Sequence, residues 1–360
     1  MKMRKSGGNT KKGRKALKIV ITAISAVLAF ILIRTFMPAR TPVIKGGNSI
    51  TEYEKVSING EDLQLMIRGN DRENPVLVFV HGGPCCSEIP YVRKYQKDLE
   101  KEFTIVHYDQ RGSGKSYRFG TDYSSVTAET HVNDLIALTE YIEKHLETGK
   151  VILLGHSYGT YIATQAAAKR PDLYSAYIGI GQMSDTVQSE LNTLEKCIAA
   201  ATEKGDSRAA TELKALKTPI SNGEAIVPRS YVGKYGFGAR LINDDLDYVT
   251  AFLFGPEYNL RDAFGFYKAV GEYQDSLVME GLTHPITEIV NSIDIPVYFV
   301  MGRYDGMTSP EAAGEYLSNL KGNGEKKLII FEESAHYPQF EEKDEFCKWM
   351  KEIKDEDDRN

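Results

Sequence analysis

The sequence has little cysteine and no acidic residue near its start. Its 360 residues include four cysteines, too few for a disulfide framework, and no two of them have the CxxC spacing of a zinc site. The first 18 positions hold eight Lys or Arg and no Asp or Glu, whereas the whole chain carries a net charge of −6. The remainder is therefore strongly acidic. This argues against a nucleic-acid-binding protein, because phosphate contacts need a basic face.

One long hydrophobic run is present, close to the N-terminus. Residues 19–33 carry no charge, and residues 17–37 would span about 31 Å as a helix if Lys18 and Arg34 snorkel to the membrane surfaces. Because cations precede the run, the pattern predicts a basic cytoplasmic tail (1–16), a transmembrane signal anchor and an extracytoplasmic body. The alternative is a cleaved secretory signal, but no small-x-small cleavage site follows the run.

The rest of the sequence has the alternation typical of an α/β fold. Residues 38–50 are rich in Pro and Gly and are interpreted as a linker. Apolar, strand-like runs then alternate with helical patterns; these runs are 63–68, 76–80, 104–108, 151–154, 176–180, 296–301 and 328–331. Because they are apolar throughout, they indicate a mostly parallel sheet that is buried on both faces. The alternation stops over 185–285, which predicts a helical cap inserted between core segments 51–184 and 286–360.

A candidate nucleophile follows one of these strands. The sequence Gly155-His156-Ser157-Tyr158-Gly159 comes directly after the run 151–154 and precedes a helical pattern. This is G-x-S-x-G in a strand–turn–helix context, where the glycines permit a tight turn and the serine hydroxyl is exposed. The motif predicts that Ser157 is a catalytic nucleophile.

A serine nucleophile needs a histidine as base and a carboxylate to orient that base, and with this motif the chain order is Ser, acid, His. His336 follows the last strand-like run, and Asp305 follows the run 296–301. Both therefore lie at carboxyl ends of strands, where open α/β sheets place their ligands. Asp294 precedes its strand and lies at the opposite edge. The sequence predicts a triad of Ser157, Asp305 and His336.

Backbone N–H groups are expected to bind the oxyanion that forms when the serine attacks a carbonyl. One comes from Tyr158, the residue after the nucleophile. The other is assigned to Gly83, in the turn 81–85 that follows the run 76–80. Cys85 and Cys86 in and after this turn are interpreted as small packing residues. The segment 109–116 ends in GKS, but Asp109 stands where a phosphate-binding loop needs glycine, so this segment is predicted to form the floor of the site.

Five motifs together resemble one family. They are HGGP at 81–84, DQRGSGKS at 109–116, GHSYG at 155–159, GRYD at 302–305 and SAH at 334–336. In this order they are similar to the signatures of α/β-hydrolases of the prolyl aminopeptidase (proline iminopeptidase) family, over about residues 52–352. The resemblance implies a serine hydrolase with a helical cap over the triad, no metal, no organic cofactor and small peptide substrates. Two positions depart from the family pattern, since Cys85 stands where glycine is usual and Tyr158 where tryptophan is common.

The substrate class stays open at this point. The family uses cap glutamates to hold the free amine of the substrate, and no local motif chooses among Glu190, Glu195, Glu257 and Glu272. A carboxylesterase or lipase-like acyl hydrolase would need the same triad and would differ only in its pocket. A catalytically silent binding protein on the same fold would be expected to lack a triad member or the oxyanion turn, and neither is missing. Epoxide hydrolysis is disfavoured, because its nucleophile at this position is Asp.

Overall fold

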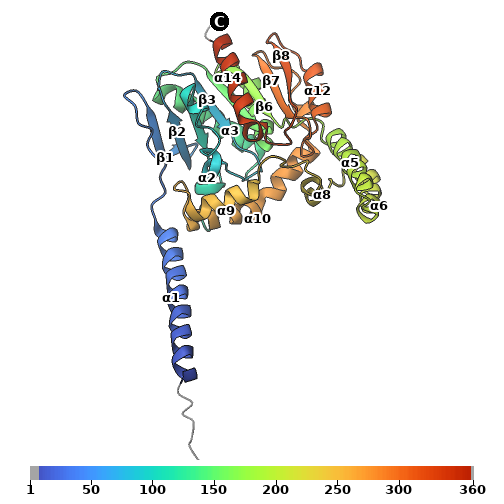
Figure 1. Cartoon of the computed structure of the whole chain (residues 1–360). Helices are drawn as coiled ribbons and strands as arrows, with labels where there is room; N and C mark the ends of the chain where they lie inside the picture. Colours follow the sequence, from blue (N-terminus) through green and yellow to red (C-terminus); the bar gives the residue numbers. More distant parts are fainter. Residues whose placement is uncertain (1–7, 358–360) are drawn as a thin grey trace, which may run out of the picture.

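The computed structural model describes residues 8–357, and its strands form one eight-stranded sheet (Figure 1). The strand order is β1-β2-β4-β3-β5-β6-β7-β8, antiparallel from β1 to β4 and parallel from β4 to β8. The strands are β1 Ile50–Ile58, β2 Glu61–Gly69, β3 Val76–Val80, β4 Thr104–Tyr108, β5 Val151–His156, β6 Tyr174–Ile180, β7 Val297–Gly302 and β8 Lys326–Phe331. The prediction of a mostly parallel sheet is therefore confirmed.

The sequence pattern did not indicate β1. Glu52, Glu54 and Lys55 interrupt any apolar alternation there, because β1 is an edge strand whose residues are largely solvent-accessible. Its pairing with β2 extends over the full length of both strands, from Ile50 opposite Gly69 to Ile58 opposite Glu61. An edge strand can have polar, exposed side chains, so it leaves no apolar pattern in the sequence and is identified only by its pairing with β2.

Helices cover both faces of the sheet. One face packs against α3 (Ala128–His145), α4 (Tyr158–Lys169) and α12 (Pro310–Asn319), and the other packs against α14 (Lys343–Asp357). In α3 the buried residues Val132, Leu135, Leu138 and Ile142 recur at helical spacing, and Thr127 begins the helix with a capping box. Burial on both faces explains why β3 to β7 are largely apolar, whereas β8, at the edge of the sheet, begins with Lys326 and Lys327 and is only partly buried.

Between β6 and β7 the chain forms a run of helices beyond the carboxyl ends of the strands. They are α5 Thr186–Glu203, α6 Ser207–Ala215, α7 Lys217–Ser221, α8 Arg229–Lys234, α9 Asp244–Phe254 and α10 Leu260–Thr283. We refer to these helices as the cap. Figure 1 shows α9 and α10 along the lower edge of the body, with α5 and α6 to one side. Short helices complete the fold: α2 Ile89–Val92, α11 Ile286–Ile289, α13 Pro338–Glu341 and the 3₁₀ turns Leu99–Lys101 and Gly114–Ser116.

The N-terminal helix α1 (Gly8–Phe36) leaves the body beside α9 and α10 (Figure 1). Its segment Gly13–Phe36 has 24 residues and is apolar enough to cross a membrane, and none of its apolar window is buried in the protein. Length and composition fit a membrane span, and an N-terminal signal sequence has the same properties. The first residues of the expected basic tail lie outside the described part of the chain.

Candidate active site

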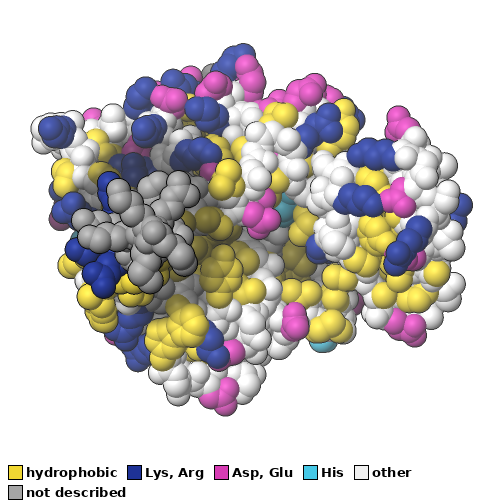
Figure 2. Space-filling model, turned by 60° about the horizontal axis from the view of Figure 1, so that its bottom comes forward, with side chains coloured by type: hydrophobic (Ala, Val, Ile, Leu, Met, Phe, Trp, Pro, Cys, Tyr) yellow, Lys and Arg dark blue, Asp and Glu magenta, His cyan; other side chains and the backbone are white. Residues whose placement is uncertain are grey.

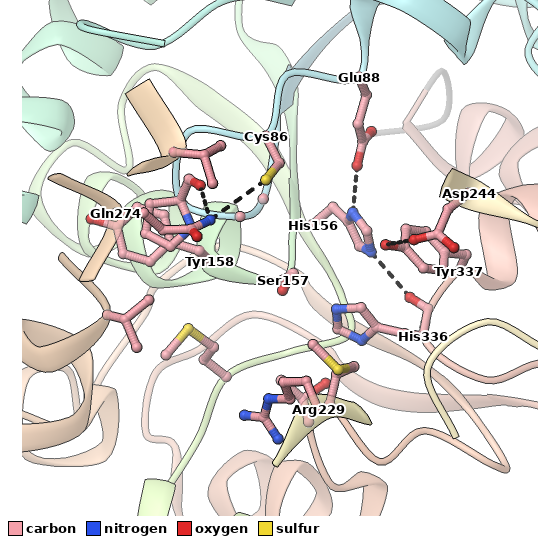
Figure 3. Close-up of a pocket in the computed structure, with 18 of the residues that line it drawn as sticks. Cys86, Glu88, His156, Ser157, Tyr158, Arg229, Asp244, Gln274, His336 and Tyr337 are labelled. Atoms are coloured by element: carbon pink, nitrogen blue, oxygen red, sulfur yellow. Dashed lines mark hydrogen bonds and ion pairs between the residues drawn. The ribbon is translucent and has the colours of Figure 1, made fainter. Parts of the chain in front are cut away.

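A cavity of about 580 Å³ lies between the carboxyl ends of the parallel strands and the cap. Ser157 and His336 line it from the core, and helices α5, α9 and α10 contribute residues from the cap. Figure 3 shows the residues that surround this space. The cavity is where the sheet topology predicts a ligand site, because loops from several parallel strands converge at this edge.

Ser157 occupies the turn between β5 and α4. Its backbone has φ 53° and ψ −124°, a strained conformation for a residue other than glycine, and its N–H donates to the carbonyl of Ile180 at 2.9 Å. The turn is tight because α4 starts directly against β3. A Cβ atom at Gly159 would lie 2.0 Å from the carbonyl oxygen of Val80, so only glycine fits there.

His336 and Asp305 form a buried pair. The Nδ1 of His336 lies 2.9 Å from Oδ2 of Asp305, and Asp305 is fully buried. The carboxylate also accepts hydrogen bonds from the backbone N–H of Met307 at 2.8 Å and of Thr308 at 2.9 Å. Burial alone would raise the pKa of Asp305, but His336 and these N–H donors outweigh burial and hold the pKa below its usual value. Asp305 therefore remains ionised and fixes the orientation of the His336 ring.

The structure brings Ser157 and the His336–Asp305 pair to one end of the cavity. In Figure 3 the His336 ring lies beside Ser157. The contacts described for this part of the chain include no hydrogen bond between the two side chains. Such a contact is often long in a site without substrate and becomes shorter when the substrate is bound.

The two predicted oxyanion donors also line the cavity. Tyr158 is the first residue of α4, where backbone N–H groups have no partner within the helix. Gly83 belongs to the turn after β3, and a Cβ at the preceding Gly82 would lie 2.9 Å from Cβ of Ser157. The backbone of this turn thus passes directly over the serine.

The segment 109–116 holds this turn in place. The Gln110 N–H donates to Nε2 of His81 at 3.1 Å, and its side-chain amide donates to the His81 carbonyl at 2.7 Å. Since Nε2 accepts, Nδ1 carries the proton and donates to the Gly82 carbonyl at 2.9 Å. Burial lowers the pKa of His81 to about 3, so the ring stays neutral. The sequence placed Gln110 and the rest of 109–116 in the floor of the site, but no residue of this segment lines the cavity. No role was assigned to His81.

A second buried pair of a histidine and a carboxylate, His156 with Glu88, lies near the turn after β3, and no sequence pattern indicated it. Nδ1 of His156 lies 2.5 Å from Oε1 of Glu88, and its Nε2 lies 3.0 Å from the His336 carbonyl oxygen (Figure 3). Both partners are acceptors, so both ring nitrogens donate and the ring is a charged imidazolium. Burial opposes this charge, but Glu88 and the His336 carbonyl outweigh burial and raise the pKa of His156. The pair supports the backbone of His336.

Of the four cap glutamates suggested by the resemblance, only one lines the cavity. Glu190 lines the cavity but is paired with Arg229 at 2.5 Å, and the other three, Glu195, Glu257 and Glu272, do not line it. Three aspartates line it instead: Asp244, Asp245 and Asp275. None of the three forms an ion pair with Lys, Arg or His among residues 8–357. The cavity is thus acidic.

The neighbouring cysteines are not alternative nucleophiles. Both are free, and burial raises the pKa of the Cys86 thiol to about 12, so it stays protonated. Cys85 has φ 68°, which explains why glycine is usual at this position in the family that the chain resembles.

One group of possible metal ligands occurs within the described residues, and it lies elsewhere. Glu52, Glu54 and His145 approach one another at the surface, between β1 and α3. None of them lines the cavity. His145 already pairs with Glu52 at 2.7 Å, so this group has no connection with the candidate active site.

The fold and this site define an α/β hydrolase. Residues 75–343 match the family model for the alpha/beta hydrolase fold, so the chain belongs to this family and is a hydrolase. It resembles prolyl aminopeptidases: it is 34% identical over 310 residues to the protein named "Probable aminopeptidase YbaC" of Bacillus subtilis (strain 168), covering 84% of this chain and 96% of that protein. A proline iminopeptidase of Saccharolobus solfataricus is 25% identical over 304 residues, covering 81% of this chain and 87% of the relative.

Solved structures agree with this fold. A proline iminopeptidase-related protein of Thermus thermophilus superposes with a TM-score of 0.58 at 21% identity, covering 84% of this chain and 96% of that one. A proline iminopeptidase of Mycobacterium smegmatis has a TM-score of 0.56 at 14% identity, and the match covers 85% of this chain and 99% of that one. At these identities the likeness concerns the fold alone.

We expect Glu88→Gln to destabilise the protein by about 3–5 kcal/mol, because it leaves a buried imidazolium without its counter-charge. The raised pKa of His156 means that its pair stabilises the fold below about pH 6.5 and that this contribution is lost as the pH rises through the raised value. Denaturant unfolding of the full chain in detergent at several pH values measures the free energy of unfolding of both proteins. The difference between wild type and Glu88→Gln should become smaller at higher pH.

The matched control is Glu52→Gln, which removes the partner of His145. In that pair the side chains are 28% and 30% exposed, so we expect a change below about 1 kcal/mol. A Glu88→Gln protein as stable as the wild type near pH 6 would show that His156 is uncharged.

Proposed function

We propose that the protein is a serine hydrolase that cleaves short peptides from their N-terminus by acyl transfer. The proposal rests on the His336–Asp305 pair that lies beside Ser157 in the cavity. In this reaction Ser157 Oγ attacks the scissile carbonyl while Nε2 of His336 takes its proton. Asp305 holds the ring in the Nδ1–H tautomer and stabilises the imidazolium that forms. The N–H groups of Gly83 and Tyr158 bind the oxyanion.

The intermediate then collapses, the bond to the leaving amine breaks, and His336 gives its proton to that amine. The serine remains acylated. A water molecule next attacks the acyl carbonyl, transfers a proton to His336, and releases the acid as the proton returns to Ser157. Each half of the reaction uses the same base and the same oxyanion donors, so one arrangement of side chains serves both.

Three observations support a substrate with a free amine. Asp244, Asp245 and Asp275 give the cavity negative charge that no cation of the described chain pairs with, whereas the charge of Glu190 is matched by Arg229. A protonated amine complements such a cavity. Asp244 is the least exposed of the three, and the Tyr337 hydroxyl, which donates to it at 3.1 Å, fixes the position of its carboxylate at the cavity (Figure 3). Relatives named as aminopeptidases support the same substrate class.

The position in the cell follows from the N-terminal segment. We propose that α1 is a single transmembrane anchor with the N-terminal tail in the cytoplasm and the hydrolase body outside. The apolar length of α1 supports the span, and the eight Lys and Arg of residues 1–18, which precede its uncharged segment, support the orientation.

Ser157→Ala and His336→Ala should each reduce turnover by about 10⁴- to 10⁶-fold, and the double variant should be hardly worse, because triad members act as a unit. Asp305→Asn should cost somewhat less. The control is Asp294→Asn, an exposed aspartate before β7, which should leave turnover unchanged. Single-turnover kinetics on aminoacyl amides measure these effects, and loss of activity in the control alone would make Asp294 the orienting acid.

A free prolyl or alanyl amide should be cleaved at least about 100-fold faster than its N-acetyl form, equivalent to about 2.7 kcal/mol in the barrier. Asp244→Asn should remove most of this preference by slowing cleavage of the free amine alone. The control is Glu272→Gln, since Glu272 does not line the cavity. Equal rates on free and blocked substrates, or turnover of acyl esters only, would assign the site to an esterase instead.

Full-length protein should stay in the membrane fraction after cell breakage, and protease added outside spheroplasts should digest the body. Immunoblotting with antibodies against the body follows both results. Recovery of a soluble form that begins near residue 40 would identify the segment as a cleaved signal.

A further inference from the structure

The end of α1 is fixed to the cap by a buried arginine. Arg34 is 4% exposed, and its Nη2 donates to the carbonyl oxygens of Phe252, Gly255 and Tyr258 at 2.9, 2.8 and 2.9 Å. These carbonyls belong to the end of α9 and to the turn that leads into α10. A charged donor with several buried acceptors sets both the position and the direction of the helix that carries it.

Contacts on both sides of Arg34 extend this junction. Before it in the chain, the rings of Phe30 and Phe254 are 6.0 Å apart. Beyond it, the N–H of Arg40 donates to the Pro256 carbonyl at 2.8 Å. The chain therefore follows the α9–α10 turn from Phe30 to Arg40, and the end of α1 is part of the packed body rather than a flexible tether.

An exposed hydrophobic surface adjoins the junction. We call it the apolar cap face; it consists of Leu246, Val249 and Phe254 of α9, Phe264 and Tyr267 of α10, and Phe119, with exposed fractions from 46% to 69%. The rings of Phe119 and Phe264 stack at 5.7 Å. Figure 2 looks toward the side from which α1 emerges and shows hydrophobic side chains gathered on it. Several large apolar groups together on one face mark an interaction surface.

The position of this face beside α1 identifies its partner as a lipid bilayer. Phe30 lies seven residues before Met37, where the expected membrane-spanning segment 17–37 ends, a helical rise of about 10 Å. If α1 spans the membrane, its contact Phe254 lies at the depth of about 5–10 Å to which interfacial helices bury their apolar faces. Aromatic side chains are preferred at this level, and Arg261, next to the Phe119 ring, is suited to phosphate headgroups.

We propose that the apolar cap face is a membrane-docking surface, so that the cap rests in the headgroup region and the active-site cavity opens at the bilayer. Tyr267 links the two features, because it belongs to this face and also lines the cavity. Amphiphilic substrates held at the membrane surface would then reach Ser157 without crossing bulk water. The inference rests on the proposed transmembrane role of α1 and deepens the proposed function.

Tryptophan fluorescence of the full chain in vesicles tests the proposal, because the sequence has a single tryptophan, Trp349 in α14. The test variant combines Trp349→Phe with Phe264→Trp. The matched control combines Trp349→Phe with Leu328→Trp, an exposed position on β8, far from α1 in Figure 1. In phosphatidylcholine vesicles with brominated acyl chains, we expect emission from position 264 to be quenched at least twofold and emission from position 328 to be unchanged.

A third variant adds Arg34→Gln to the test variant. It should reduce quenching at position 264 toward the control, while α1 still resists extraction at alkaline pH. Equal quenching at positions 264 and 328 with α1 resistant to extraction would overturn membrane docking and leave the anchor intact. Equal quenching together with a concentration-dependent dimer would assign the face to a second copy of the chain. Extraction of the wild-type protein would overturn the membrane span, and docking with it.

Discussion

The close approach of α4 to β3 is the constraint on which the site depends. Because the backbone at Gly159 touches the Val80 carbonyl, the turn before it has no room for a relaxed conformation, and Ser157 is held at positive φ with its side chain at the cavity. The same approach brings the turn after β3 over Ser157, so the proposed nucleophile and the proposed oxyanion turn are positioned by one contact. The strain at Ser157 persists because packing of the sheet and α4 outweighs it.

Buried charge is the second principle of the site. Two buried histidines at the site have carboxylate partners, His156 with Glu88 and His336 with Asp305, and their different surroundings separate their roles. His156 meets acceptors at both nitrogens, which favour its charged form, whereas Nε2 of His336 has no such acceptor among the described contacts. One ring is therefore structural and the other is free to exchange a proton. Asp244, without an ion-pair partner among the described residues, adds negative charge to the same cavity.

Local patterns made most of the sheet and the candidate triad predictable. The central parallel strands are largely apolar, and Ser157, Asp305 and His336 follow β5, β7 and β8 by one, three and five residues. The features that escaped prediction depend on distant contacts. Glu88 pairs with His156, 68 residues away in the sequence, and Gln110 binds His81, 29 residues away. A local sequence pattern cannot predict contacts over such separations. The resemblance pointed to glutamates of the cap, but the unpaired carboxylates at the cavity belong to aspartates, which spacing could not select.

Helix α1 and the turn after β3 belong to one continuous set of contacts. Arg34 binds the Tyr258 carbonyl, and the Tyr258 hydroxyl donates at 2.5 Å to Asp109, whose pKa burial raises to about 6. Asp109 precedes Gln110, which holds His81 at the start of the oxyanion turn. A carboxylate buried at this depth needs its hydrogen-bond donors when it is ionised, so the cap cannot lift away from the core at Tyr258 without exposing or protonating Asp109. The attachment of α1 therefore fixes the same part of the cap that covers the cavity, and the direction of the helix is set relative to that cavity.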